Sequence, residues 1–390
     1  MIASGGPPRQ ALVIGAGLAG AAVCAQLARR GWQIHLLDAA SGPAQGASAL
    51  PVGMLSPHVT RAPTPLSRLC ALGMQTTLFE LQRLVPQGQG WQACEVDNLG
   101  HDPGRWPAAL VRPAALVQAW LAEAGSQLST RWEARVEHLE RTPSGTWRAL
   151  DASGQQLAEA PVAVVAAAFG SHALLSQPTQ HMEPAHLPLR PVKGQMSLAA
   201  LSGLPLAERP QRNSGVFVPL YEDSGMPPEW PQRLWVMGST YTRGDATTHL
   251  TSEAHEANAS SLQDICPPAA ERLRHQQAAG ELLGWAQVRC ASLDRLPLVG
   301  AVPDPAALRL LAERDGARRG RGAPRDMPRQ PGLYLFTALG SRGITLAALC
   351  AGLLADELQG VEAGTVDADL RAAIDPARFA WRQARRQSPT

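Results

Sequence analysis

A glycine pattern close to the N-terminus constrains the fold of this 390-residue chain more than any other feature. Residues 12–20 read LVIGAGLAG, in which a short apolar run enters the pattern G-x-G-x-x-G and an alanine-rich helical pattern follows it. In such a pattern Gly15 permits a tight turn, Gly17 lets a pyrophosphate approach the backbone, and Gly20 lets the helix pack close to the strand. The N–H groups that begin the helix then hold phosphate. The segment therefore predicts a strand–turn–helix unit that binds a dinucleotide.

A second strand completes this unit. Residues 32–37 are mostly apolar and run into Asp38. This acid lies about 20 residues after the glycine pattern, where an acidic side chain binds a ribose hydroxyl. The order of strand, glycines, helix, strand and acid predicts a Rossmann-like fold rather than a glycine-rich loop without a ligand. The residues expected to contact the cofactor here are Gly15, Gly17, Leu18, Ala19, Gly20 and Asp38.

A segment near the C-terminus favours FAD over NAD as the cofactor. Residues 339–345 read LGSRGIT and lead into a long Ala/Leu helical pattern over 344–358. This would place a second helix N-terminus at the cofactor, where its dipole can stabilise negative charge on a reduced flavin. An NAD-dependent dehydrogenase has no need of this second contact and is the less favoured alternative. The residues expected to contact the flavin here are Gly340, Ser341, Gly343 and Ile344.

The remaining patterns predict an α/β protein with two domains. A Rossmann-like FAD-binding domain with a parallel sheet is expected from residues 9–60, 110–186 and 286–390. Short alternating runs predict a second, α+β substrate-binding domain with an antiparallel sheet, from residues 61–109 and 187–285. Residues 313–330 are rich in arginine, glycine and proline and are expected to form a flexible loop. Further helices are expected over 66–84, 113–124 and 252–262.

Composition limits the other classes of function. The net charge of +2 does not by itself predict a polyanion partner, although arginines gather in 313–330 and in the tail at Arg382, Arg385 and Arg386. These runs are either solvated segments or contacts to a phosphate backbone. The six cysteines show no C-x-x-C and no metal-type histidine spacing, so no metal site is expected. No signal peptide or membrane-spanning run is seen, which favours a cytoplasmic protein without a membrane partner.

Several longer segments resemble one family of flavoenzymes. The glycine pattern, residues 46–48 (GAS) and the late RGIT helix start resemble the glycine oxidase and D-amino-acid oxidase (DAO) superfamily of FAD enzymes. Within it, the chain resembles the FAD-dependent oxidoreductase domains of the MnmC family, which act on 5-carboxymethylaminomethyl(-2-thio)uridine at the tRNA wobble position. The segments that carry this resemblance are PVKGQ at 191–195, GSTYTRG at 238–244, VRCASLDRLPLVGAVPD at 288–304, LGSRG at 339–343 and DPAR at 375–378.

The resemblance implies a reaction and a set of site residues. The expected reaction oxidises the glycyl CH2–NH bond with FAD, and hydrolysis of the imine then releases glyoxylate and leaves 5-aminomethyl(-2-thio)uridine. Arg289, and as a second candidate Arg342, are expected to bind the substrate carboxylate, because arginine offers a planar bidentate donor. Arg342 and Tyr241 are expected beside the substrate, and Ala47 and Ser48 beside the cofactor. The implied partners are the tRNA and a methyltransferase domain or protein that acts next.

Two departures from the family pattern keep other hypotheses open. The loop that follows Ser48 reads ALPVG where the family usually has Gly-Asn, and residues 215–216 read Gly-Val where it has Gly-Tyr. An amine oxidase for free glycine or sarcosine would use the same FAD and Arg289 but would not need the basic segments. A flavin- and RNA-binding protein without turnover would hold FAD that no substrate reduces. Lys193 is either a positive wall for RNA or a solvated loop charge.

Overall fold

A parallel sheet forms one end of the molecule. The computed structural model describes residues 9–176, 185–304, 306–307, 310, 323–361 and 366–386. In the described residues this sheet has six strands in the order β17-β18-β10-β1-β2-β6, and only β17 runs antiparallel to its neighbour. Its strands are β1 (Gln10–Ile14), β2 (Gln33–Leu37), β6 (Leu128–Arg131), β10 (Val162–Val165), β17 (Leu298–Pro303) and β18 (Arg329–Thr337). The predicted Rossmann-like parallel sheet is confirmed.

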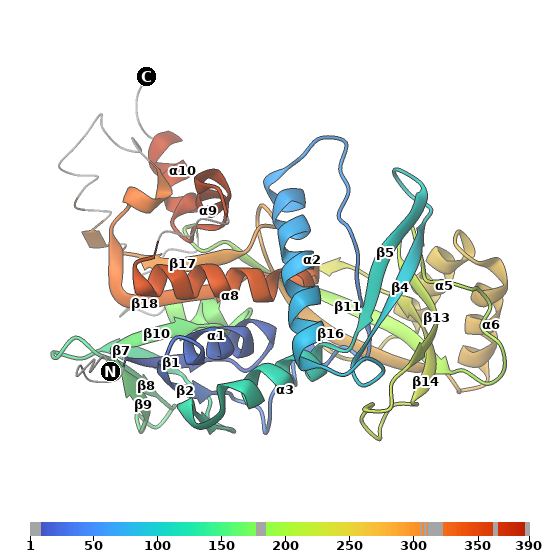
Figure 1. Ribbon diagram of the computed structural model, residues 1–390, viewed down its shortest axis with the longest axis horizontal. Helices are drawn as coiled ribbons and strands as arrows, with labels where there is room; N and C mark the ends of the chain where they lie inside the picture. Colours follow the sequence, from blue (N-terminus) through green and yellow to red (C-terminus); the bar gives the residue numbers. More distant parts are fainter. Residues whose placement is uncertain are drawn as a thin grey trace.

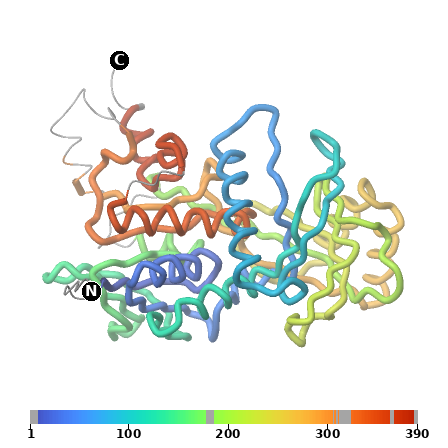
Figure 2. The backbone as a smooth tube through the Cα atoms, viewed as in Figure 1, coloured from blue at the N-terminus to red at the C-terminus, as the bar shows by residue number. Residues whose placement is uncertain are grey.

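Three helices cover one face of this sheet. Helix α1 (Leu18–Ala28) packs against α3 (Pro113–Ala124) and α8 (Gly343–Gln359), and ten of its eleven residues are buried. Small alanine side chains let the helices approach closely, and the apolar faces of β1 and β10 close the core beneath them. In Figure 2 the N-terminal and C-terminal parts of the chain lie side by side here. The opposite face is covered by a small antiparallel sheet of β7 (His138–Arg141), β8 (Trp147–Leu150) and β9 (Gln156–Ala160).

A second, largely antiparallel sheet forms the other end of the molecule (Figure 1). Its order is β15-β11-β14-β13-β12-β4-β5-β3, and β16 also pairs with β11. Helices α5 (Ser252–Gln263) and α6 (Pro267–Ala278) pack on it, and α2 (Pro65–Leu84) stands between the two ends. Its strands are β3 (Gly53–Leu55), β4 (Trp91–Asn98), β5 (Gly104–Val111), β11 (Leu189–Ala200), β12 (Gln211–Arg212), β13 (Val216–Glu222), β14 (Arg233–Gly238), β15 (Thr242–Arg243) and β16 (Leu283–Ser292).

The two sheets do not follow the expected domain boundaries. Residues 61–109 and 187–285 supply most of the second sheet, but β3 and most of β16 also belong to it, although the sequence places them with the FAD-binding domain. The expected boundaries therefore stay a prediction. Of the expected loop 313–330, residues 313–322 lie outside the described residues, and residues 329–330 begin β18 rather than a loop. Arg329 is ion-paired there with Asp375 at 2.8 Å.

The C-terminal segment folds back onto the parallel sheet through α9 (Ala368–Ile374) and α10 (Arg378–Arg386). Arg382, one of the tail arginines considered for RNA contacts, is ion-paired with Asp294 at 2.7 Å. The Arg385 guanidinium lies over the ring of Trp381.

Among the described residues, no helix combines the length and the apolar character that a membrane span needs. Among the same residues, no cluster of histidine, cysteine and acidic side chains could hold a metal ion.

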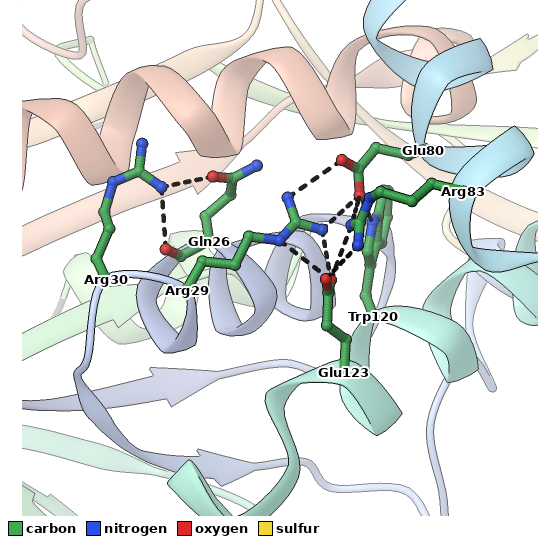
Figure 3. A network of polar contacts seen from close by, with 7 residues as sticks. All are labelled: Gln26, Arg29, Arg30, Glu80, Arg83, Trp120 and Glu123. Atoms are coloured by element: carbon green, nitrogen blue, oxygen red, sulfur yellow. Dashed lines mark hydrogen bonds and ion pairs between the residues drawn. The ribbon is translucent and has the colours of Figure 1, made fainter.

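A buried carboxylate ties α1, α2 and α3 together (Figure 3). Glu80 on α2 accepts hydrogen bonds from Arg29 Nη2 at 2.6 Å, Trp120 Nε1 at 2.8 Å and Arg83 Nη2 at 3.1 Å. Both arginines also bind Glu123 on α3. Since Arg29 ends α1, this cluster fixes the helix whose other end begins at the glycine pattern.

We expect Glu80→Ala to lower the free energy of unfolding by about 3 kcal/mol, because it leaves buried donors without their acceptor. Urea denaturation followed by circular dichroism measures this change. Glu222→Ala is the matched control, since it breaks an exposed pair with Arg233 and should cost less than about 1 kcal/mol. Equal losses in the two variants would contradict the role given to the cluster.

Candidate functional site

A cavity of about 930 Å³ lies where the two sheets meet. Its wall includes the start of α1, residues 47–59, the turn between β4 and β5, the end of β14, part of β16 and residues 336–345. Segments from both ends of the chain and from both sheets therefore face one space. Of the residues predicted from the sequence, the cavity wall includes Gly17, Leu18, Ala19, Ala47, Ser48, Tyr241, Arg289, Gly340, Ser341, Arg342, Gly343 and Ile344.

The glycine pattern takes the conformation that its sequence predicts. Gly15 has a positive φ of 107°, and a Cβ on Gly20 would lie 1.8 Å from the Gly15 carbonyl oxygen. At Gly17 a Cβ would meet only the Ser48 hydroxyl, at 3.0 Å, so this backbone is open toward the cavity. The same hydroxyl accepts a hydrogen bond from the Leu18 N–H at 3.0 Å. The start of α1 is thus shaped to receive a phosphate group.

Asp38 lies behind this loop rather than on the cavity wall. Its Oδ2 accepts from the Ala16 N–H at 2.6 Å, and its Oδ1 accepts from the Ala40 N–H at 2.8 Å. The carboxylate therefore holds the glycine turn against the end of β2. Its expected contact with a ribose stays a prediction.

A second helix N-terminus meets the cavity at Gly343. The chain leaves β18, makes one short turn over Gly340–Arg342 and enters α8. A Cβ on Gly343 would lie 3.0 Å from the Leu18 side chain, so the starts of α1 and α8 are close together. Neither helix has an acidic residue in its first turn. Two positive helix ends beside one cavity, and a glycine backbone open toward it, fit a dinucleotide that also carries a flavin.

Arg289 reaches the cavity from β16. Its Nη2 donates to the Ser239 hydroxyl, and its guanidinium lies 5.8 Å from the centre of the Tyr241 ring. Its Nη1 is buried without a hydrogen-bond partner. Burial lowers the pKa of this guanidinium, although arginine stays charged in proteins. A buried cationic donor that lacks an acceptor is suited to bind an anion entering the cavity.

The position of Arg289 depends on Gly194, which the sequence analysis did not single out. The two residues lie on the paired strands β11 and β16, and a Cβ on Gly194 would lie 2.0 Å from Arg289 Nη2. The absence of a side chain at Gly194 therefore makes room for the guanidinium. The PVKGQ segment contains Gly194, but its contact with Arg289 across two strands cannot be read from the sequence.

We expect Gly194→Ala to lower kcat/KM by about 10- to 100-fold, because the new methyl group displaces the guanidinium from the cavity wall. Binding of FAD should be unchanged, since Gly194 does not line the cavity. Steady-state kinetics together with the flavin content of the purified protein measure both quantities. Full activity in this variant would show that the position of Arg289 does not matter.

Arg342 and Tyr241 also lie where the sequence predicts, although with different surroundings. Arg342 lies near the Cys70 thiol on α2, whose pKa burial raises more than Arg342 lowers it, while half of the Tyr241 surface is exposed. Burial, and then the positive charges of Arg342 and Arg212, lower the pKa of His58 on the same wall. The catalytic roles expected for Arg342 and Tyr241 stay predictions. Lys193 is neither a solvated loop charge nor a positive wall for RNA. It is 5% exposed, its Nζ donates to the Thr247 hydroxyl, and it does not line the cavity.

The cavity wall carries positive charge only. No carboxylate of the described residues lines it, whereas four arginines and two histidines do. Such a wall favours anionic ligands and disfavours a protonated amine. The basic residues on the wall are His58, His101, Arg212, Arg289, Arg295 and Arg342.

Asp294 orders the turn that follows Arg289 instead of acting in the cavity. It accepts hydrogen bonds from Arg378, 1% exposed, and from Arg382, each at 2.7 Å. Burial would raise its pKa, but the bonds and charges of these arginines outweigh burial and lower the pKa to about 2.

Because the folded pKa of Asp294 lies below its unfolded value, its contribution to stability is present above about pH 4 and is lost as the pH falls toward 2. Asp294→Asn should therefore be less stable than the wild type at neutral pH and lose less further stability between pH 4 and 2. Urea denaturation across this range measures the difference. Parallel pH profiles for the two proteins would contradict the ion pairing.

Comparisons with known proteins agree with this geometry. A family model described as FAD dependent oxidoreductase (DAO) matches residues 10–110 and 104–357. The tRNA 5-methylaminomethyl-2-thiouridine biosynthesis bifunctional protein MnmC of Paracidovorax citrulli is 36% identical over 96% of this chain and 61% of its own length. The protein of the same name from Delftia acidovorans is 35% identical over 96% of this chain and 62% of its own. The chain thus spans about three fifths of the length of these relatives.

Solved structures with the same fold include two oxidases. Glycine oxidase from Geobacillus kaustophilus aligns with a TM-score of 0.66 at 17% identity, over 93% of this chain and 98% of its own. Iminodiacetate oxidase from Chelativorans sp. BNC1 aligns with a TM-score of 0.64 at 20% identity, over 92% and 98%. At these identities the likeness shows a shared fold.

Proposed function

The chain belongs to the DAO family of FAD-dependent oxidoreductases, and from this premise we propose that it oxidises the carboxymethylaminomethyl group of a wobble uridine in tRNA. It is an oxidoreductase and its cofactor is FAD. The starts of α1 and α8 would hold the cofactor with Gly17, Leu18, Ser48 and Gly343. When bound, FAD supplies the acceptor for the two electrons that leave the substrate.

The proposed substrate group is an N-substituted glycine, uracil–CH2–NH–CH2–COO⁻. Loss of two electrons and two protons from the glycyl CH2–NH unit gives an imine. Water adds to the imine carbon, and the C–N bond breaks to release glyoxylate. The uridine keeps the nitrogen as a 5-aminomethyl group, with or without sulphur at position 2.

The residues of the cavity suit this chemistry. Arg289 binds the carboxylate and fixes the glycyl carbon, with Tyr241 packed against its guanidinium. The amine must lose its proton before oxidation, and the arginines on the wall favour its neutral form. With a neutral amine the oxidation needs no side-chain base. Arg342 adds positive charge at the start of α8.

One observation carries the proposal. Arg289 lines a cavity whose described wall residues include no carboxylate, and its Nη1 has no hydrogen-bond partner. The names of the curated relatives identify which carboxylate-bearing amine to test, since those proteins act in tRNA 5-methylaminomethyl-2-thiouridine biosynthesis. A 5-aminomethyl product needs one further methyl group to reach that nucleoside. We therefore expect a methyltransferase domain or protein to act next.

Analysis of the reacted tRNA tests this proposal. FAD-loaded protein is incubated with tRNA that carries 5-carboxymethylaminomethyluridine, and the nucleosides and glyoxylate are then quantified. We expect 5-aminomethyluridine and glyoxylate in equal amounts. Oxidation of glycine or sarcosine in place of the tRNA would instead support the small-molecule amine oxidase. No product from any of these substrates would support the flavin- and RNA-binding protein without turnover.

A further inference from the structure

Arg212 is a second cation on the cavity wall, far from Arg289 along the sheet. It lies on β12, and β11, β14 and β13 separate this strand from β16, which carries Arg289. Four strand spacings place the two backbones about 19 Å apart along the sheet. Both side chains nevertheless line the same cavity. The two arginines therefore reach this cavity from strands that lie four spacings apart in the sheet.

The Arg212 guanidinium is held in place by neutral groups. Its Nε donates to Asn98 Oδ1 at 2.9 Å, and its Nη1 donates to the Ser56 hydroxyl at 2.7 Å and to the Pro57 carbonyl at 2.9 Å. The guanidinium also lies 4.8 Å from the centre of the Trp106 ring. These contacts fix its orientation before any ligand binds, which reduces the entropy that binding would cost.

The charge of Arg212 is not compensated in the part of the chain that the structure describes. Arg112, which is more deeply buried than Arg212, is ion-paired with Asp223 at 2.7 Å, and Arg378 is paired with Asp294. No ion pair of this kind forms at Arg212, and burial lowers its pKa. Burying a charge without a partner costs stability, so an arginine kept in this state is suited to bind an anion that comes from outside.

We propose that Arg212 binds a phosphate of the substrate nucleotide while Arg289 binds its carboxylate. This inference rests on the proposed function and deepens it by stating how the enzyme distinguishes a nucleotide from a free amino acid. Glycine and sarcosine carry one carboxylate and no second anionic group. A nucleotide carries anions at both ends and can engage both arginines. His58 lies on the same wall, near the charges of Arg212 and Arg342.

The first test is binding to the FAD-loaded protein. Isothermal titration compares uridine 3′,5′-bisphosphate with uridine in the wild type, Arg212→Met, Arg212→Lys and the control Arg209→Met. Arg209 is ion-paired with Glu208 and does not line the cavity. We expect the wild type and the control to bind the bisphosphate about 10- to 100-fold more tightly than uridine. Arg212→Met should lose this preference, and Arg212→Lys should keep part of it.

The second test is turnover of 5-carboxymethylaminomethyluridine as the nucleoside and as its 3′,5′-bisphosphate. Arg212→Met should raise KM for the bisphosphate by about 10- to 100-fold and KM for the nucleoside by much less. An equal loss on both substrates would show that Arg212 only supports the wall. Loss of FAD from the variant would show that it binds the cofactor. A wild type that does not prefer the bisphosphate in titration would also overturn the inference.

The two tests separate this inference from the proposed function. If the wild type oxidises neither form of the modified nucleoside, the proposed function fails. The titration with uridine 3′,5′-bisphosphate still decides whether Arg212 binds phosphate.

Discussion

Arg289→Met should lower kcat/KM for the modified tRNA by about 100- to 1,000-fold, with FAD still bound. The guanidinium is the buried donor on the wall, and its loss removes the contact that orients the substrate carboxylate. Truncating one partner of a buried charge pair costs about 2–5 kcal/mol, which corresponds to about 30- to 5,000-fold and includes the expected range. Stopped-flow reduction of the bound flavin, measured over a range of tRNA concentrations, separates the loss of binding from the loss of rate.

Arg243→Met is the matched control for this variant. The guanidiniums of Arg243 and Arg289 each lie 5.8 Å from the centre of the Tyr241 ring, but Arg243 is exposed and does not line the cavity. We expect the control to keep kcat/KM within about 3-fold of the wild type. Equal losses in the two variants would assign the effect to Tyr241 packing rather than to carboxylate binding.

Gly20→Ala should yield a protein that retains no FAD. Its Cβ would lie 1.8 Å from the Gly15 carbonyl oxygen, so α1 would have to move away from the glycine turn that precedes it. We expect a loss of about 3 kcal/mol or more in the free energy of unfolding, because the contact is with backbone that cannot rotate aside. The flavin absorbance of the purified protein and its urea denaturation report the two effects.

Gly352→Ala controls for the substitution itself. Gly352 lies within α8, and a Cβ there would meet no heavy atom within 4 Å. Alanine has the higher helix propensity, so this variant should be more stable by about 0.5–1 kcal/mol and should keep its FAD. If Gly20→Ala also kept FAD and full stability, the close approach of α1 to the turn would not be required.

Local patterns account for what the sequence predicts well. The expected helix over 66–84 is found at Pro65–Leu84, where Thr64 and Ser67 form a capping box at its start. The helix expected over 344–358 is found at Gly343–Gln359 and ends at Gly360 in the left-handed conformation. The glycine pattern takes the predicted turn, because Gly15 and Gly20 meet steric demands that lie within one short segment.

Contacts between distant segments account for what the sequence does not predict. The pairing of β16 with β11 places Arg289 over Gly194, and the register of two strands decides it. Arg212 depends on Asn98, Ser56 and Trp106, which come from three other segments. Lys193 could not be placed from the sequence for the same reason. It is buried, and its side chain bonds Thr247, which lies more than 50 residues later in the chain. Such residues become visible only when the chain has folded.

Anaerobic reduction of the bound flavin shows whether the modified tRNA or a free amine is the substrate. FAD-loaded protein is mixed without oxygen with tRNA carrying 5-carboxymethylaminomethyluridine, with the same tRNA lacking the modification, and with glycine or sarcosine. We expect the oxidised flavin absorbance to bleach with the modified tRNA and with none of the others. Bleaching by the small amines alone, or a flavin that the modified tRNA leaves oxidised, would contradict this expectation.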